Sequence, residues 1–261
     1  MVSTQFDARQ WIAAPRNLSP NGIHDDDRAR DLGFDGGFVP GVMLYEHIAG
    51  ELMRQGLPWL EQGRVSLRFR RPVYDGEAVT WSVDPETNGF EIRGDDGMGA
   101  RATGSFEVSD DAPSVPTGGV SKAPAGVPLG DPSLIGLVMR IEERLDPALF
   151  DEIAANSGFP RDSGGRKLIP LGQWVNPIDL IYEYFGRSTT IHFEGRIWHH
   201  SPLFEDESFS TTGVITGFSE RRGNQIVEFT SLVAAGDGRP VATIEHKSVY
   251  RLARERAKQG E

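Results

Sequence analysis

The second half of the chain repeats the first at an offset of 130 residues, and this constrains the fold more than any other feature. Two stretches match without a gap, and each contains a proline. In the first, "FVPG" at 38–41 aligns with "LIPL" at 168–171, so that Pro40 matches Pro170. In the second, "RPVYDGE" at 71–77 aligns with "SPLFEDE" at 201–207, so that Pro72 matches Pro202 and Glu77 matches Glu207. Such a repeat indicates one structural unit encoded twice. The alternative is a coincidence of a few prolines.

A linker lies near the middle of the chain. Residues 109–131, "SDDAPSVPTGGVSKAPAGVPLGD", are rich in proline, glycine and serine and sustain no period. A chain of 261 residues fits either one large domain or two smaller ones. The repeat favours two, and we expect domains at 1–108 and 132–261.

Each copy has the pattern of a helix followed by antiparallel strands. In the first copy Met43, Leu44, Ile48 and Leu52 recur every three to four residues, as on one helix face, and residues 64–71, "RVSLRFRR", alternate as in a strand. In the second copy "NPIDLIYEYF" predicts the helix, with Asn176 as N-cap and Pro177 at the first helical position. Strands are expected at 189–198, 210–218, 225–235 and 241–252. The expected class is α+β, with a helix laid on a curled antiparallel sheet.

Composition excludes several function classes. The net charge of −11 disfavours a nucleic-acid partner, and the absence of cysteine removes disulfides and thiolate chemistry. No apolar run approaches the roughly 18–20 residues of a membrane span, and the N-terminus lacks a secretory signal. We therefore expect a cytoplasmic protein that does not bind membranes.

Neither a metal site nor a cofactor is expected. The three aspartates at 25–27 are more typical of a helix start than of metal ligands, and His199 and His200 alternate along a strand and so face opposite ways. Neither a glycine-rich phosphate loop nor a nucleotide fingerprint occurs.

Residues 17–81 contain four segments in a fixed order: "NGIH", a short acidic stretch, "GGFVPGVMLYEHIAG" and "VSLRFRRPVYDGEAVTW". In this order of segments, residues 17–81 resemble the MaoC-like dehydratases and (R)-specific enoyl-CoA hydratases of the hotdog superfamily. The strand-and-turn motif of that family is matched by Arg68, Phe69, Pro72, Val73 and Gly76, with Glu77 in place of an aspartate.

The resemblance implies a double hotdog, in which two central helices are each wrapped by an antiparallel sheet and the two units pair within one chain. It leaves open whether the chain stays a monomer or forms a homodimer. It also implies a lyase that hydrates or dehydrates an acyl thioester bound to coenzyme A or to a carrier protein. The acyl group, the direction of the reaction and its stereochemistry stay open.

The resemblance also implies a site, from which this chain departs at several positions. Asn21 and His24 are kept, but Ser19 stands where the family has its catalytic aspartate, Gly22 where it has proline, and Pro40 where histidine is common. Ala154 takes the place of His24 in the second copy, so at most one site per chain is expected.

A serine hydroxyl is too weak a base to replace the carboxylate. The expected catalytic groups are therefore His24 as acid-base residue and Gly41, at the start of the helix, as N–H donor to a thioester oxygen that gains charge. An aspartate at 25–27, best Asp26, is expected to orient His24. Ser19, Asn21 and Pro40 are expected to contact the substrate.

The arginines at 64–71 form the densest basic cluster, and we expect Arg68 and Arg70 to bind coenzyme A phosphates, unless they pair with neighbouring carboxylates. Two other functions stay open. The first is a non-catalytic acyl-CoA or small-ligand binding protein with a degenerate site. The second is a hotdog thioesterase or isomerase, for which Glu46 or Glu51 on the helix would be the candidate carboxylate base.

Overall fold

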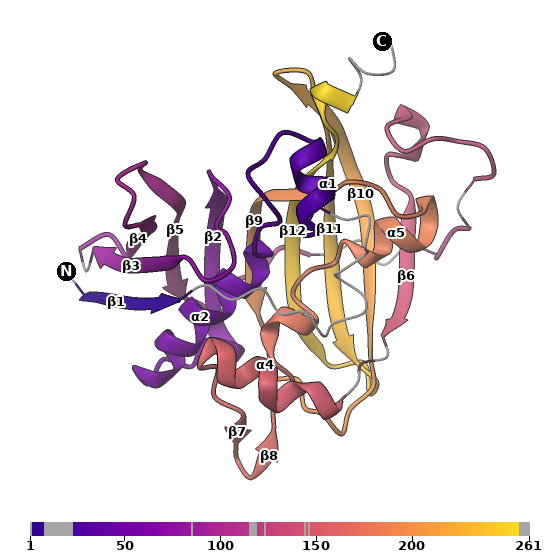
Figure 1. Cartoon of the computed structure of the whole chain (residues 1–261). Coiled ribbons are helices and arrows are strands. Elements are labelled where there is room, and N and C mark those ends of the chain that lie inside the picture. The colour runs from indigo at the N-terminus through magenta and orange to yellow at the C-terminus, as the bar shows by residue number, and fades with distance from the viewer. Residues whose placement is uncertain are drawn as a thin grey trace.

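The computed structural model describes residues 2–7, 23–84, 86–114, 119–122, 124–143, 145 and 147–255. Within them one antiparallel sheet has ten strands in the order β1-β3-β4-β5-β2-β9-β12-β11-β10-β6 (Figure 1). The strands are β1 Val2–Asp7, β2 Gly63–Phe69, β3 Ala78–Asp84, β4 Gly89–Gly94, β5 Ala100–Val108, β6 Val138–Glu143, β9 Ile191–His199, β10 Phe209–Arg221, β11 Asn224–Ala235 and β12 Pro240–Arg251. All the strands expected from the alternation of apolar residues are present, and the α+β class is confirmed.

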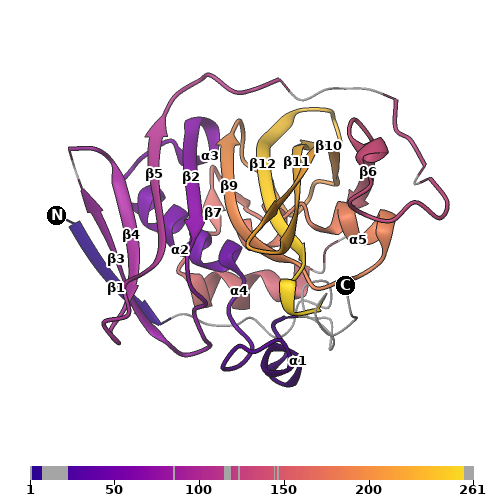
Figure 2. The same ribbon diagram turned by 90° about the horizontal axis from the view of Figure 1, so that it is seen from above.

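Short helices complete the fold. They are α1 Asp26–Asp31, α2 Gly41–Arg54, α3 Trp59–Gln62, α4 Phe150–Ser157, α5 Asp179–Phe185 and the 3-10 helices η1 Pro132–Leu134, η2 Pro147–Leu149 and η3 Leu171–Gln173, with a separate hairpin of β7 Asp162–Ser163 and β8 Arg166–Lys167. Figure 2 shows the sheet curved around α2, α4 and α5. In the described part of the chain no helix combines the length and the apolar character needed to cross a bilayer.

The two halves of the chain meet where β2 pairs with β9. Ser66 and Arg196, which are one repeat offset apart, face each other at the centre of this seam. On either side Arg64 opposes Trp198 and Arg68 opposes Glu194, and the offset converts one of these pairs into the other. The seam is therefore a local twofold axis, and the repeat is structural rather than a coincidence of prolines.

The two central helices differ. In the first half α2 runs unbroken for 14 residues, and its apolar stripe, with Leu44, Ile48 and Leu52, is buried under the sheet. In the second half η3 and α5 occupy the equivalent positions. Pro177 lies between them, and proline both lacks an N–H and clashes with the preceding turn of a helix. The prediction that Asn176 caps this helix was wrong, since α5 begins at Asp179 after Ile178.

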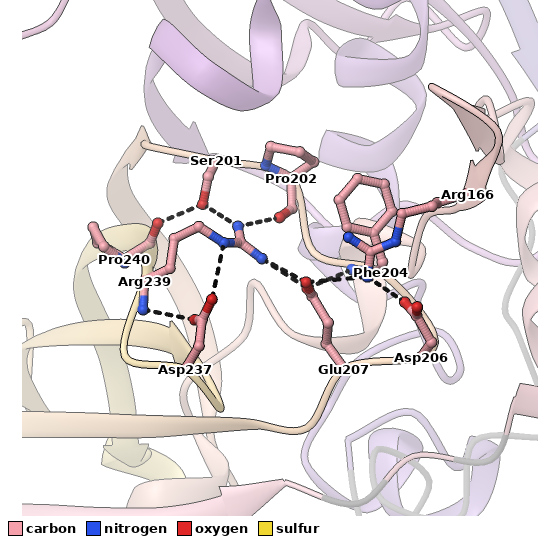
Figure 3. Close-up of polar contacts among 9 residues, drawn as sticks. All are labelled: Arg166, Ser201, Pro202, Phe204, Asp206, Glu207, Asp237, Arg239 and Pro240. Atoms are coloured by element: carbon pink, nitrogen blue, oxygen red, sulfur yellow. Dashed lines mark hydrogen bonds and ion pairs between the residues drawn. The ribbon is translucent and has the colours of Figure 1, made fainter.

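The turn after each central helix and strand repeats in detail. Phe38 bridges Tyr74 in the first half, and Leu168 bridges Phe204 in the second. The carboxylate at the end of each turn accepts from the backbone N–H three residues earlier and pairs with an arginine. The pairs are Glu77 with Arg101 and Glu207 with Arg239, and the second is drawn in Figure 3.

Candidate active site at the seam between the two halves

His24 lies in the turn before α1, against the loop that leads into α2. Its Nδ1 is 2.6 Å from the carbonyl oxygen of Phe38, and a carbonyl only accepts, so Nδ1 carries the hydrogen and Nε2 the lone pair. Burial lowers the pKa of His24 below its usual value, and the Phe38 carbonyl partly offsets this. The ring is therefore neutral near pH 7, the protonation state that a general base requires.

The loop before α2 packs closely against the backbone of His24 because it contains glycine. A Cβ on Gly37 would lie 2.1 Å from the carbonyl oxygen of His24, so no larger residue fits there without a shift. The carboxylate of Asp26 accepts from the N–H of Gly37 at 2.9 Å and also binds Arg30. Asp26 thus holds the loop, and the partner seen at His24 Nδ1 is Phe38 rather than an aspartate.

A small cavity of about 50 Å³ opens beside His24, and both halves of the chain line it. We call it the His24 cavity. The first half contributes His24, Phe38, Pro40, Gly41 and Val42, and the second half contributes Asn176, Tyr182, Thr190, His192 and Ser248. Three residues expected in the site, His24, Pro40 and Gly41, thus meet here. Two further residues expected there, Ser19 and Asn21, lie outside the described residues.

Gly41 opens α2 at the edge of this cavity. The first N–H groups of a helix have no partner within it, and the helix dipole favours a negative charge beside them. A Cβ on Gly41 would lie 2.5 Å from the ring of Phe69, which packs against the helix start. Glycine at this position therefore lets an aromatic wall approach the first N–H groups of the helix.

A second cavity, of about 190 Å³, adjoins the first and shares Phe38, Gly41, Ile191 and His192 with it. We call it the Arg70 cavity, because the exposed residues Arg70 and Arg71 lie at its rim. Arg68 does not line it and instead lies 3.6 Å from Glu194 across the seam. Of the two arginines expected to bind phosphates, only Arg70 therefore borders the cavity.

His192, on β9, was not among the residues expected in the site. Its ring stacks on that of His246 at 3.9 Å between centroids, and it meets Phe69 edge-on at 5.2 Å. Burial lowers the pKa of His192 to about 4, and burial also lowers the pKa of His246 well below its ordinary value. Nothing in the sequence around "TTIHFEGRIW" indicates this placement, because it depends on β9 pairing with β2 more than 120 residues away.

Glu46 on α2, one of the two carboxylates considered as a thioesterase base, is buried and lines neither cavity. It accepts from the Ser157 hydroxyl and from the N–H of Gly172, the latter at 2.5 Å. Burial raises the pKa of Glu46 to about 7, against the effect of these two hydrogen bonds. Glu51, by contrast, pairs with Arg54 on the surface of the helix.

No group of three or more histidine, aspartate or glutamate side chains in the described ranges could hold a metal ion. The histidines at 199 and 200 face opposite ways, as their alternation predicted. His199 is buried and lies 2.5 Å from the Tyr45 hydroxyl, which also accepts from Trp59, whereas His200 lies 2.9 Å from Thr243.

His199 predicts a loss of stability in acid. Burial lowers its pKa in the fold to about 3, whereas the unfolded chain has the ordinary value of 6.5. Below pH 6.5 the unfolded state therefore binds a proton that the folded state does not, and stability falls as pH falls. From pH 8 to pH 5 His199 alone should lower the free energy of unfolding by about 2 kcal/mol.

The measurement is urea unfolding of wild type and His199→Phe across this pH range. The variant keeps an aromatic ring in the core but has no group to titrate, so its stability should depend less steeply on pH. Equal slopes for the two proteins would contradict the prediction, whatever the difference in their absolute stability.

Comparison with known proteins identifies the fold. No protein-family model matches the sequence. No curated protein matches it either. Solved structures do match over nearly the whole chain, at low identity.

A conserved hypothetical protein of Mycobacterium tuberculosis with a double hotdog fold is 13% identical, with a TM-score of 0.63 over 95% of this chain and 96% of its own. A protein named as a MaoC domain dehydratase, from Chloroflexus aurantiacus, is 12% identical, with a TM-score of 0.56 over 97% and 96%. A protein named as a thioesterase, from Novosphingobium aromaticivorans, is 12% identical, with a TM-score of 0.51 over 83% and 89%. The double hotdog expected from the sequence is confirmed.

Proposed function

We propose that this double hotdog protein is a MaoC-like hydratase or dehydratase that acts on an acyl thioester such as enoyl-CoA or 3-hydroxyacyl-CoA. The observation that carries the proposal is the shared cavity: the neutral ring of His24 and the N-terminus of α2 at Gly41 line the same small space. A base and an oxyanion-binding group on one cavity are the two elements that addition of water to a conjugated thioester requires.

The reaction follows from this pair. In hydration, His24 Nε2 takes a proton from a water molecule whose oxygen bonds to C3 of the enoyl thioester, and the electrons of the C2–C3 double bond shift to the thioester oxygen. The N–H of Gly41 binds the resulting enolate oxygen. The imidazolium then gives its proton to C2, so that one water is added and His24 is neutral again. Dehydration is the reverse.

The Arg70 cavity supplies the binding site for the carrier. Arg70 and Arg71 are exposed at its rim in a chain of net charge −11, so they form a local attraction for the phosphates of coenzyme A or of a pantetheine arm. The apolar wall between them and Gly41 includes Phe69, Pro72 and Val73. A thioester could therefore extend from the basic rim to Gly41, with its acyl group toward His24.

The test is a panel of trans-2-enoyl-CoA and 3-hydroxyacyl-CoA substrates of increasing length, assayed for hydration, dehydration and release of free thiol. We expect interconversion of enoyl and 3-hydroxyacyl thioesters without thiol release, and faster reaction of the shorter acyl groups. Absence of turnover, with tight binding of acyl-CoA measured by calorimetry, would instead indicate the non-catalytic binding protein.

Thioester hydrolysis is the second candidate, because Glu46 supplies a carboxylate on the central helix whose pKa burial raises to about 7. It is the weaker candidate, since Glu46 is held by Ser157 and Gly172 away from both cavities. Thiol release that is lost in Glu46→Gln would establish hydrolysis and overturn the hydratase proposal.

A further inference from the structure

The local twofold axis makes Asn176 the counterpart of Glu46, and Val42 the counterpart of Gly172, since each pair is one repeat offset apart. On one side of the axis Glu46, from the first half of the chain, accepts from the N–H of Gly172, from the second half. On the other side of the axis Asn176 and Val42, again from different halves, both line the His24 cavity. The same two positions thus form a closed contact on one side of the seam and two walls of a cavity on the other.

Asn176 carries an unusual polar atom for a folded interior. Its Oδ1 is buried and has no hydrogen-bond partner among the residues that the structure describes. Buried polar atoms are nearly always paired, so an unpaired one calls for a specific reason, such as a ligand. Asn176 and His24 line the same cavity, so a ligand bound there lies between these two side chains' elements and is a candidate partner for this oxygen.

We propose that Asn176 Oδ1 accepts a hydrogen bond from the hydroxyl group of a 3-hydroxyacyl thioester, or from the water that becomes this hydroxyl on hydration. The inference rests on the function proposed above and adds the residue that holds the reacting oxygen. It also narrows the substrate, since the cavity of about 50 Å³ has room for little more than one water molecule beside a short acyl group. The substrate class is therefore a short-chain 3-hydroxyacyl thioester.

An amide fits this role better than the carboxylate at the equivalent position. The amide oxygen accepts a hydrogen bond from one O–H of the water while His24 takes the proton of the other. Asn176 therefore neither gains nor loses a proton in the step. A carboxylate there would repeat the contact of Glu46 and bind the N–H groups at the start of α2. It would then compete with the enolate oxygen for the same donors.

The experiment compares wild type with Asn176→Ala and Asn176→Glu on crotonyl-CoA and 3-hydroxybutyryl-CoA. Asn176→Ala should lower kcat/KM by about tenfold to a hundredfold, the usual effect of losing one hydrogen bond to the reacting group. Its melting temperature should stay equal or rise, because a buried unpaired acceptor is removed. A residue with a purely structural role would show the opposite change in stability.

Asn176→Glu should lower kcat/KM by about a hundredfold or more at pH 8 and recover activity as the pH falls and the introduced carboxylate is protonated. The matched controls are Asn156→Ala and Asn156→Glu on the exposed side of α4, which should keep wild-type kinetics. These pairs separate the effect of the site from that of the residue type.

The outcomes are distinguishable. If wild type does not interconvert the two thioesters, the proposed function fails and the role of Asn176 fails with it. If wild type is active and folded Asn176→Ala keeps its kcat/KM, only the role of Asn176 is overturned.

Discussion

Replacing His24 by glutamine should lower kcat/KM for hydration by about 10²- to 10⁴-fold, the usual contribution of a general acid-base residue. Glutamine keeps a side chain that can bind the Phe38 carbonyl, so the loop before α2 should stay in place. It has no basic nitrogen, however, so it can neither take a proton from water nor return one to C2. The measurement is steady-state kinetics with a short enoyl-CoA, together with a binding constant for the product.

Two readouts separate this loss from general damage. The affinity for the product should change little in His24→Gln. The matched variant His200→Gln makes the same substitution at a histidine outside the cavity, and it should keep wild-type rates. In wild type the rate of hydration should persist below pH 6.5, because burial lowers the pKa of His24. A His24→Gln enzyme with wild-type kcat/KM would exclude His24 as the base.

Replacing Arg101 by methionine should destabilise the protein by about 3–5 kcal/mol, the effect of breaking a buried ion pair. The Arg101 side chain is 7% exposed, and it binds Glu77 at 2.6 Å and Asp96 at 2.6 Å. Methionine fills much of the volume but leaves Glu77, itself 14% exposed, without its cation. The measurement is the free energy of unfolding in urea at pH 7.

The repeat supplies the control. Arg239 pairs with Glu207 in the corresponding turn, but its side chain is 29% exposed, and Glu207 also lies 3.2 Å from Arg166, so the carboxylate that Arg239→Met leaves behind keeps a cation (Figure 3). We expect the smaller loss of stability in Arg239→Met. Equal losses, or a larger one in Arg239→Met, would contradict the prediction that Arg101 holds the stronger of the two pairs.

The fold could be predicted from the sequence because the patterns that indicate it are either local, within one helix or strand, or repeated between the two halves of the chain. Alternation in 64–71 predicted β2, the apolar stripe predicted α2, and the offset of 130 residues predicted one unit encoded twice, whereas the seam at which Ser66 faces Arg196 was not predicted. The second central helix could be predicted only in part. Its apolar pattern is helical, but Pro177 falls five residues after Gly172 and interrupts it.

The candidate site could be predicted only on its first half. His24, Pro40 and Gly41 lie close in sequence, so a motif can indicate them together, whereas Asn176 and His192 reach the cavity only through the pairing of β2 with β9. The partners of charged residues were also beyond local reasoning. Arg68 faces Glu194 from the other half, and Asp26 binds Gly37, because register and loop geometry choose among the neighbouring groups.

The covalent joining of the two units has a consequence for how their sites can differ. When two identical chains pair, every substitution appears on both sides of the axis, so a side chain that suits one site is imposed on the other. Here positions 46 and 176 are separate positions of one chain, and they hold a carboxylate and an amide. One side can thus become part of the folded core, as Glu46 has, while the other remains open to a ligand.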